Sequence, residues 1–145
     1  MSVSDRTILV TGGAGFVGSH VADALVADND VRILDNFSSG ERANCPEGAT
    51  VIEGDIRDDD ALARATDGVD TIFHEAALVS VARSVEDPTT SNDINADGTL
   101  AVLEAARRAD ARVVFASSAA VYGDPDSLPI AESDPKEPTS PYGLE

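Results

Sequence analysis

Apolar residues along the chain fall into short runs that alternate with longer segments of helical periodicity. The short runs are rich in β-branched residues and have the length of buried strands. Between them, apolar residues recur at three- and four-residue spacing, which is typical of helices that cover a sheet. We expect strands at 7–10, 31–34, 50–53, 71–74 and 112–116, and helices after the first strand, at 59–65 and at 92–108.

This alternation predicts the α/β class, with right-handed crossovers and a Rossmann-like doubly wound parallel sheet. The first helix should bury Val17, Val21, Ala24 and Leu25, and the long helix Ile94, Ala101, Val102 and Ala105. Prolines crowd the chain after Gly123, which excludes a regular helix or a central strand there. We therefore expect one α/β domain over 1–123 and a Pro-rich ordered loop over 124–145.

The charge is strongly negative: 27 Asp and Glu against 10 Lys and Arg give −17. Such a surface repels nucleic acid and anionic lipid, and no apolar run is long enough to span a membrane. We predict a soluble, cytoplasmic protein with no nucleic-acid or membrane partner. Because the acids are spread along the whole chain, adaptation to a halophile's salt is favoured over an acidic face for a basic partner.

The cysteine and histidine content argues against disulfide bonds and metal sites. Cys45 is the only cysteine, so no internal disulfide forms. His20 and His74 are the only histidines and fall on different predicted elements without a cysteine partner. We therefore predict no metal site.

A glycine-rich stretch, Thr11–Gly18, joins the first expected strand to the first helix. Gly13, Gly15 and Gly18 satisfy GxGxxG, while Gly12, Gly15 and Gly18 satisfy the TGxxGxxG spacing. Glycines permit a tight turn and let backbone N–H groups and the helix N-terminus approach a pyrophosphate. The alternative is a plain strand-to-helix turn, but the placement favours a dinucleotide loop.

The second strand is expected to end at Asp35, 17 residues after Gly18. This is close to the spacing of the acid that binds the adenine ribose hydroxyls of a dinucleotide. A carboxylate there would repel a 2′-phosphate, and residues 36–39 contain no arginine to hold one. NAD is therefore favoured over NADP. Arg42, the next arginine, is the residue that could reverse this preference, and a simple turn-forming role for Asp35 is the alternative.

Seven blocks now stand in order along the chain: TGGAGFVGSH at 11–20, DNFSSG at 35–40, GDIRD at 54–58, HEAA at 74–77, NADGT at 95–99, SSAAVYG at 117–123 and SPYG at 140–143. Together they resemble the extended short-chain dehydrogenase/reductase family, in particular its NAD-dependent nucleotide-sugar epimerases of the UDP-glucose 4-epimerase type. The resemblance covers essentially the whole chain. It implies that 1–123 is the NAD-binding domain and that 124–145 holds the active-site loop and the start of the catalytic helix.

The resemblance also implies a set of cofactor-binding residues. The backbone at Phe16 and Val17 would meet the pyrophosphate, Asp55 and Ile56 the adenine, and Ala76 and Ala77 the cofactor cleft, which Asn95 would steady from the long helix. The complete set is Gly12, Gly15, Phe16, Val17, Gly18, Asp35, Asn36, Ser39, Gly40, Asp55, Ile56, Ala76, Ala77 and Asn95. Roles as turn residues, core filler or a helix-end polar group are the alternatives. Glu75 departs from the apolar residue common in the family.

Ser118 and Tyr142 resemble the family's catalytic serine and tyrosine. In such enzymes the tyrosine takes the sugar O4 proton while hydride leaves C4, and hydride then returns to the other face of the 4-keto sugar. The family also places a lysine four residues after the tyrosine, which here would follow Glu145. We therefore expect the fold to be truncated before its last strand and substrate domain, and this chain alone to be inactive.

Several relatives remain as alternatives. Ala119 and Ala120 stand where the family's 4,6-dehydratases place acidic residues, and alanine cannot transfer protons. This favours an epimerase acting on a UDP-hexose over a dehydratase or reductase. A non-catalytic NAD-binding domain is a third reading, and a homodimer of the full-length protein is a further expectation.

Overall fold

A computed structural model describes residues 3–145, and the chain divides into two compact units. The first unit comprises Met1–Ala77 and Gly98–Ala116, and the second Leu78–Asp97 and Ser117–Glu145. This division follows contacts within the fold. The expected functional division after residue 123 concerns cofactor binding and stays a prediction.

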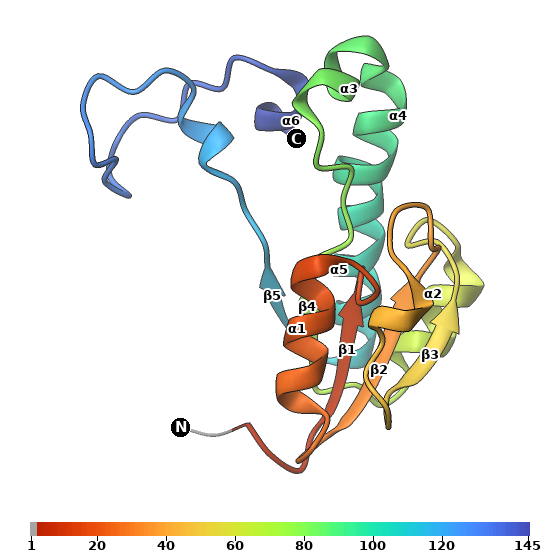
Figure 1. Cartoon of the computed structure of the whole chain (residues 1–145). Helices are drawn as coiled ribbons and strands as arrows, with labels where there is room; N and C mark the ends of the chain where they lie inside the picture. Colours follow the sequence, from red (N-terminus) through yellow and green to blue (C-terminus); the bar gives the residue numbers. More distant parts are fainter. Residues whose placement is uncertain (1–2) are drawn as a thin grey trace. The chain divides into compact units, whose positions relative to one another are not determined.

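The first unit is built on a parallel five-stranded sheet with the strand order β3-β2-β1-β4-β5 (Figure 1). The strands are β1 (Thr7–Thr11), β2 (Asp30–Asp35), β3 (Thr50–Glu53), β4 (Thr71–His74) and β5 (Arg112–Phe115). Thr11 pairs with Leu34 on one side and His74 on the other, so the glycine stretch leaves the sheet where the chain order reverses. The predicted Rossmann-like fold and all five strands are confirmed, within about one residue at their ends.

Helices cover both faces of this sheet. Alternate residues of each strand point to opposite faces, so Ile8 and Val10 pack toward α1 (Phe16–Leu25). Leu9 points the other way, into a cluster with α2 (Asp59–Thr66) and α5 (Gly98–Ala109). Burial on both faces explains why β1 and β2, in the middle of the sheet, are largely apolar runs. The expectation of a fifth buried strand at 112–116 is wrong, because β5 lies at the edge of the sheet and its Val114 and Phe115 side chains are exposed.

The buried face of α1 differs from the one expected. Val17 and Ala24 are exposed, whereas Gly18, Ser19 and Ala22 are buried. A β-carbon on Gly18 would overlap the Gly12 carbonyl oxygen, so this helix lies too close to the glycine turn for larger side chains. The helix therefore presents its smallest residues to the sheet, and Val21 and Leu25 pack at the margin of the core.

The second unit contains short helices and no strand among its described residues. They are α3 (Val81–Glu86), α4 (Pro88–Asn92), the π-helical turn η2 (Asp93–Asp97), the 3₁₀ turn η3 (Ala119–Tyr122) and α6 (Pro141–Leu144). A further 3₁₀ turn, η1 (Arg42–Asn44), belongs to the first unit. Between η3 and α6, as the prolines predict, residues 124–140 contain neither a helix nor a strand.

The prediction of a single helix at 92–108 is wrong for the first third of that range. Helical backbone begins earlier, at Pro88, and passes through the π-helical turn η2 before α5 begins at Gly98. Because a π turn adds a residue, the 3.6-residue periodicity does not carry through it. The apolar pattern correctly placed Val102 and Ala105 in the core, but Ile94 belongs to the other unit. No helix within 3–145 has both the length and the hydropathy required to cross a membrane.

Candidate functional site

The glycine turn begins where β1 ends. The Gly12 N–H donates to the Leu34 carbonyl at 2.8 Å, and the Gly15 N–H donates to the Gly12 carbonyl at 3.1 Å. Gly12 has a φ of +69°, and a β-carbon there would lie 2.6 Å from the Ala76 nitrogen. Only glycine fits this position, because both the backbone conformation and the space exclude a side chain.

The N-terminus of α1 opens directly from this turn, and no side chain within residues 3–145 caps it. Gly15 occupies the N-cap, it offers no side-chain acceptor, and the first helical turn contains no acidic residue. The flanking Phe16 and Val17 side chains are 80% and 56% exposed. The first N–H groups of a helix lack intrahelical partners and carry the positive end of the helix dipole. This end of α1 can therefore accept an anion such as a phosphate.

Asp35 lies at the end of β2, beside the glycine turn. Its side chain is buried, and Oδ2 accepts a hydrogen bond from the Ala14 N–H at 2.9 Å. Oδ1 accepts from the Phe37 N–H at 2.8 Å. The structure therefore brings together the two features that the sequence had only related by spacing, the glycine turn and the acid at the end of the second strand.

The segment that follows β2 is also fastened to the glycine turn. A β-carbon on Gly40 would lie 2.8 Å from Ala14 atoms, and the Glu41 N–H donates to the Ala14 carbonyl at 3.1 Å. The Asn44 side chain donates to the same carbonyl at 2.9 Å. Ser39, one residue earlier, is exposed. These contacts fix residues 36–40 beside the turn, where the resemblance places cofactor contacts.

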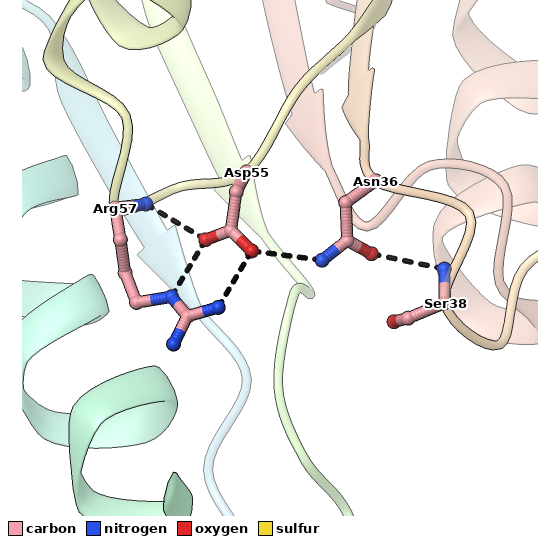
Figure 2. A network of polar contacts seen from close by, with 4 residues as sticks. All are labelled: Asn36, Ser38, Asp55 and Arg57. Carbon is pink, nitrogen blue, oxygen red and sulfur yellow. Dashed lines mark hydrogen bonds and ion pairs between the residues drawn. The ribbon is translucent and has the colours of Figure 1, made fainter.

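Asp55 and Ile56 follow β3 at the same edge of the sheet. Ile56 is 5% exposed and belongs to the core, so only its backbone is available to a ligand. The Asp55 carboxylate is bound by Asn36 and by Arg57 (Figure 2). These hydrogen bonds, mainly those of the Arg57 side chain, hold the pKa of Asp55 well below its usual range. Arg57 had no predicted role.

Beyond β4 the chain returns to the glycine turn through Ala76. Its N–H lies 3.4 Å from the Thr11 hydroxyl, and the Glu75 N–H donates to the Thr11 carbonyl at 3.1 Å. Ala76 is half-buried and Ala77 is exposed, as residues lining a cleft can be. Partial burial raises the pKa of the Glu75 carboxyl, and nothing in the structure explains this residue further.

His74 is a polar core residue for which the sequence suggested no role. Its side chain is 2% exposed, with Nδ1 at 2.6 Å from the Thr11 hydroxyl and Nε2 at 3.0 Å from the Thr99 hydroxyl. Burial lowers its pKa to about 4, so the ring is neutral at physiological pH. It links β1, β4 and α5 behind the glycine turn. A histidine closing an apolar strand was the available signal, but its partners lie far away in sequence.

Arg42, the arginine whose position could reverse the preference for NAD, binds other groups of the protein. Its guanidinium donates to Glu53 at 2.8 Å and stacks over the Phe37 ring at 4.6 Å. Both groups of the ion pair are exposed, so its contribution to stability is small.

The second unit holds Asn95, Ser118 and Tyr142. Asn95, in the π-helical turn, accepts from the Leu78 N–H at 2.8 Å and donates to the Leu78 carbonyl at 3.2 Å and to Glu145 at 2.7 Å. Ser118 is the N-cap of η3 and accepts from the Ala120 N–H at 3.2 Å. The Tyr142 N–H donates to the fully buried Ser84 hydroxyl at 3.1 Å. A β-carbon on Gly143 would lie 2.7 Å from the Ala120 carbonyl oxygen, so the turns carrying Ser118 and Tyr142 pack closely.

Comparison with known proteins gives consistent relatives. The family described as "NAD dependent epimerase/dehydratase family" matches residues 8–145. The putative UDP-glucose 4-epimerase of Methanocaldococcus jannaschii is 48% identical over 141 residues, which cover 94% of this chain and 46% of that protein.

Solved structures are similar as well. A UDP-N-acetylglucosamine 4-epimerase from Methanobrevibacter ruminantium, in complex with UDP-N-acetylmuramic acid, superposes with a TM-score of 0.93 and 41% identity over 98% of this chain and 47% of its own. The UDP-glucose 4-epimerase from Brucella ovis in complex with NAD superposes with a TM-score of 0.91 and 37% identity, over 96% of this chain and 44% of its own. The chain thus spans a little under half the length of these relatives.

These matches confirm the resemblance to nucleotide-sugar epimerases and the choice of NAD as the family's cofactor. The roles of the individual site residues stay predictions, as does adaptation to a halophile's salt.

Proposed function

Since the chain belongs to the NAD-dependent epimerase/dehydratase family, we propose that it is the NAD-binding portion of a UDP-hexose 4-epimerase. One observation carries the proposal: the uncapped N-terminus of α1 and the Asp35 carboxylate stand at the same turn, joined by the bond from Ala14 to Asp35. An anion-binding helix end beside a buried acid suits a dinucleotide, which carries a diphosphate next to a ribose diol.

The cofactor would contact both the N-terminus of α1 and the Asp35 carboxylate. The N–H groups at Phe16 and Val17 would bind the pyrophosphate. Gly12 and Gly18, which lack a β-carbon, let the turn pack against the Ala76 backbone and against the start of α1. Each Asp35 oxygen accepts one backbone N–H, and a carboxylate oxygen can accept about two hydrogen bonds. One acceptor position on each oxygen therefore remains for a ribose hydroxyl. A buried negative charge at this point would also repel the additional phosphate of NADP.

The remaining cofactor contacts follow the family's pattern. Asn36, Ser39 and Gly40 would lie along the adenosine, and Asp55 and Ile56 at the adenine. Ala76 and Ala77 would line the cleft near the nicotinamide, with Asn95 supporting the segment that begins at Leu78.

Ser118 and Tyr142 are the proposed catalytic residues. Tyr142 would take the proton from the sugar O4 and later return it, while Ser118 would donate a hydrogen bond to the same oxygen. Bound NAD supplies the hydride acceptor for the sugar C4 and the donor for its return. Ala119 and Ala120, which follow Ser118 in η3, have no group that could remove water from the sugar, so epimerisation is favoured over dehydration.

Titration of NAD and NADP by calorimetry, at molar KCl, tests the cofactor site. We expect the chain to bind NAD more tightly than NADP. Asp35→Ala should lower the affinity for NAD by about tenfold or more, because two hydrogen bonds to a charged acceptor are lost. Asp23→Ala, at an exposed position of α1, is the matched control. Equal binding of both cofactors, or full affinity in Asp35→Ala, would contradict the proposal.

The proposal extends to the whole protein, for which we infer a UDP-hexose substrate and a cytoplasmic homodimer. Because the chain spans under half the length of its relatives, we expect residues 1–145 alone to bind NAD without turning over UDP-galactose. Measured epimerisation by this chain alone would overturn that expectation.

A further inference from the structure

The Asp55 carboxylate is held between two loops by four hydrogen bonds (Figure 2). Three come from Arg57: the backbone N–H at 3.0 Å and Nε at 2.8 Å reach Oδ1, and a terminal guanidinium nitrogen reaches Oδ2 at 2.8 Å. The fourth comes from the Asn36 side chain, which donates to Oδ2 at 2.9 Å from the loop after β2. The loops that follow β2 and β3 are thereby tied together through one carboxylate.

These four donors are not equivalent. A carboxylate offers about four acceptor positions, so all are occupied in this arrangement. The Arg57 bonds are charge-assisted and come from a planar fork, which fixes the orientation of the carboxylate. Asn36 is an exposed, neutral amide that water can satisfy in place of Asp55. An incoming donor would therefore displace Asn36 and leave the Arg57 pair intact.

The electrostatics support a fixed and permanently charged acceptor. The Arg57 side-chain hydrogen bonds outweigh partial burial and keep the pKa of Asp55 below its ordinary range. The carboxylate is therefore ionised at any pH at which the protein would work. A group that is already oriented loses little rotational freedom when it binds a ligand, which favours affinity.

We propose that Arg57 is a positioning residue, an inference that rests on the proposed NAD site. Arg57 holds Asp55 as the acceptor for the exocyclic amino group of the cofactor's base. This amino group displaces the Asn36 side chain from Asp55. The consequence is specificity at the base. The site should prefer adenine, which carries a 6-amino group, to hypoxanthine, which carries an oxygen there.

The test compares NAD with nicotinamide hypoxanthine dinucleotide, in which a carbonyl oxygen replaces the 6-amino group and N1 carries a hydrogen. We expect the wild-type chain to bind NAD about tenfold more tightly, the effect of one hydrogen bond to a charged acceptor. Arg57→Met should remove this preference by weakening NAD while leaving the affinity for the hypoxanthine analogue unchanged. Arg57→Lys, which keeps the charge but loses the fork, should retain about a threefold preference.

Two further variants complete the design. Asn36→Ser keeps an acceptor for the Ser38 N–H but no longer reaches Asp55, and it should retain the preference for NAD. Arg107→Met removes a comparable ion pair, with Glu104 on the surface of α5, and should change neither affinity. Thermal unfolding of each variant checks that it is folded, and Arg57→Lys decides the question should Arg57→Met fail to fold.

Each result has a definite meaning. A wild-type chain that binds both dinucleotides equally, an Arg57→Met variant that weakens both to the same extent, or an Asn36→Ser variant that loses the preference would overturn the inference. A wild-type chain that binds neither dinucleotide would instead overturn the proposed function.

Discussion

The two units of this chain are stabilised in different ways. In the first unit, five parallel strands exchange backbone hydrogen bonds, and clusters of buried apolar side chains lie on both faces of its central strands. In the second unit, Leu78 is the only buried apolar side chain among the described residues, and the buried Ser84 and Ser91 hydroxyls bond to the backbone or to Glu145. Hydrophobic burial dominates the first unit, and side-chain hydrogen bonds organise the second.

This contrast matches the two proposed tasks. In the proposed site, backbone amides and one carboxylate would bind a diphosphate and a ribose, and a rigid sheet edge positions such groups well. The proposed Ser118 and Tyr142 stand on short turns, whose geometry depends on caps such as those of Ser118 and Ser140. Elements with few buried apolar contacts open locally at lower free energy than a sheet core does. The second unit should therefore be the more sensitive of the two to loss of a single polar side chain.

The largest effect is expected at the glycine turn of the first unit. Gly12→Ala introduces a β-carbon 2.6 Å from the Ala76 nitrogen and places it on backbone with a φ of +69°. We expect a loss of about 3 kcal/mol in the free energy of unfolding, from left-handed strain and overpacking together. Urea denaturation measures it.

Gly68→Ala separates the two causes. Gly68 has nearly the same φ, +67°, but no atom lies within 4 Å of its added β-carbon. It should lose only about 1 kcal/mol, from backbone strain alone. Equal losses at both positions would show that close packing at Gly12 contributes nothing.

The second prediction concerns the buried ring of His74. Its folded pKa of about 4 lies below the ordinary value of 6.5, so the unfolded chain binds more protons between these values. The stability from the neutral ring is complete above about pH 6.5 and declines as pH falls toward 4. His74→Gln lacks this term, and the stability gap between wild type and variant should narrow by about 2 kcal/mol from pH 7 to pH 5.

His20 provides the control for this pH dependence. It is the other histidine of the chain, exposed on α1, and bonds through its ring to the Phe16 carbonyl. His20→Gln keeps the buried His74 ring, so the loss of stability attributed to that ring should persist in this variant. A constant gap between wild type and His74→Gln across this range would argue against a neutral, buried ring.

The same contrast explains what the sequence could predict. The strands were visible because burial on both faces leaves uninterrupted apolar runs, and Asp35 was visible because the fold fixes its spacing from Gly18. The face of α1 was misjudged because close approach selects small residues over apolar ones. Hydrogen bonds such as those of Asn95 to Leu78 or of Arg57 to Asp55 leave no periodic pattern, so they became visible only in three dimensions.

The third prediction tests the polar framework of the second unit. Asn95→Ala leaves both the N–H and the carbonyl of Leu78 without their side-chain partner. We expect a loss of about 1 to 2 kcal/mol, since partly buried polar groups become unsatisfied. Hydrogen exchange should show faster exchange in Leu78–Asp97 and in α6, and unchanged protection in the sheet. Asn92→Ala, at an exposed position of α4, should have little effect, and uniform deprotection of both units would contradict this local role.

The smallest effect should be shared by both units, because it comes from net charge. The chain carries −17, and five ion pairs are formed among residues 3–145. Asp23→Asn in the first unit and Asp126→Asn in the second each remove one exposed charge. In 0.1 M KCl each should stabilise by a few tenths of a kcal/mol, because screening over about 10 Å leaves much of the repulsion in place.

In 2 M KCl the screening length falls below about 3 Å, so both gains should vanish and the wild-type melting temperature should rise. Thermal unfolding at the two salt concentrations measures both effects. A gain that persists at high salt would indicate a local defect at the substituted position. A wild-type melting temperature that does not rise with salt would contradict the interpretation of the acidic composition, which is spread over both units, as an adaptation to salt.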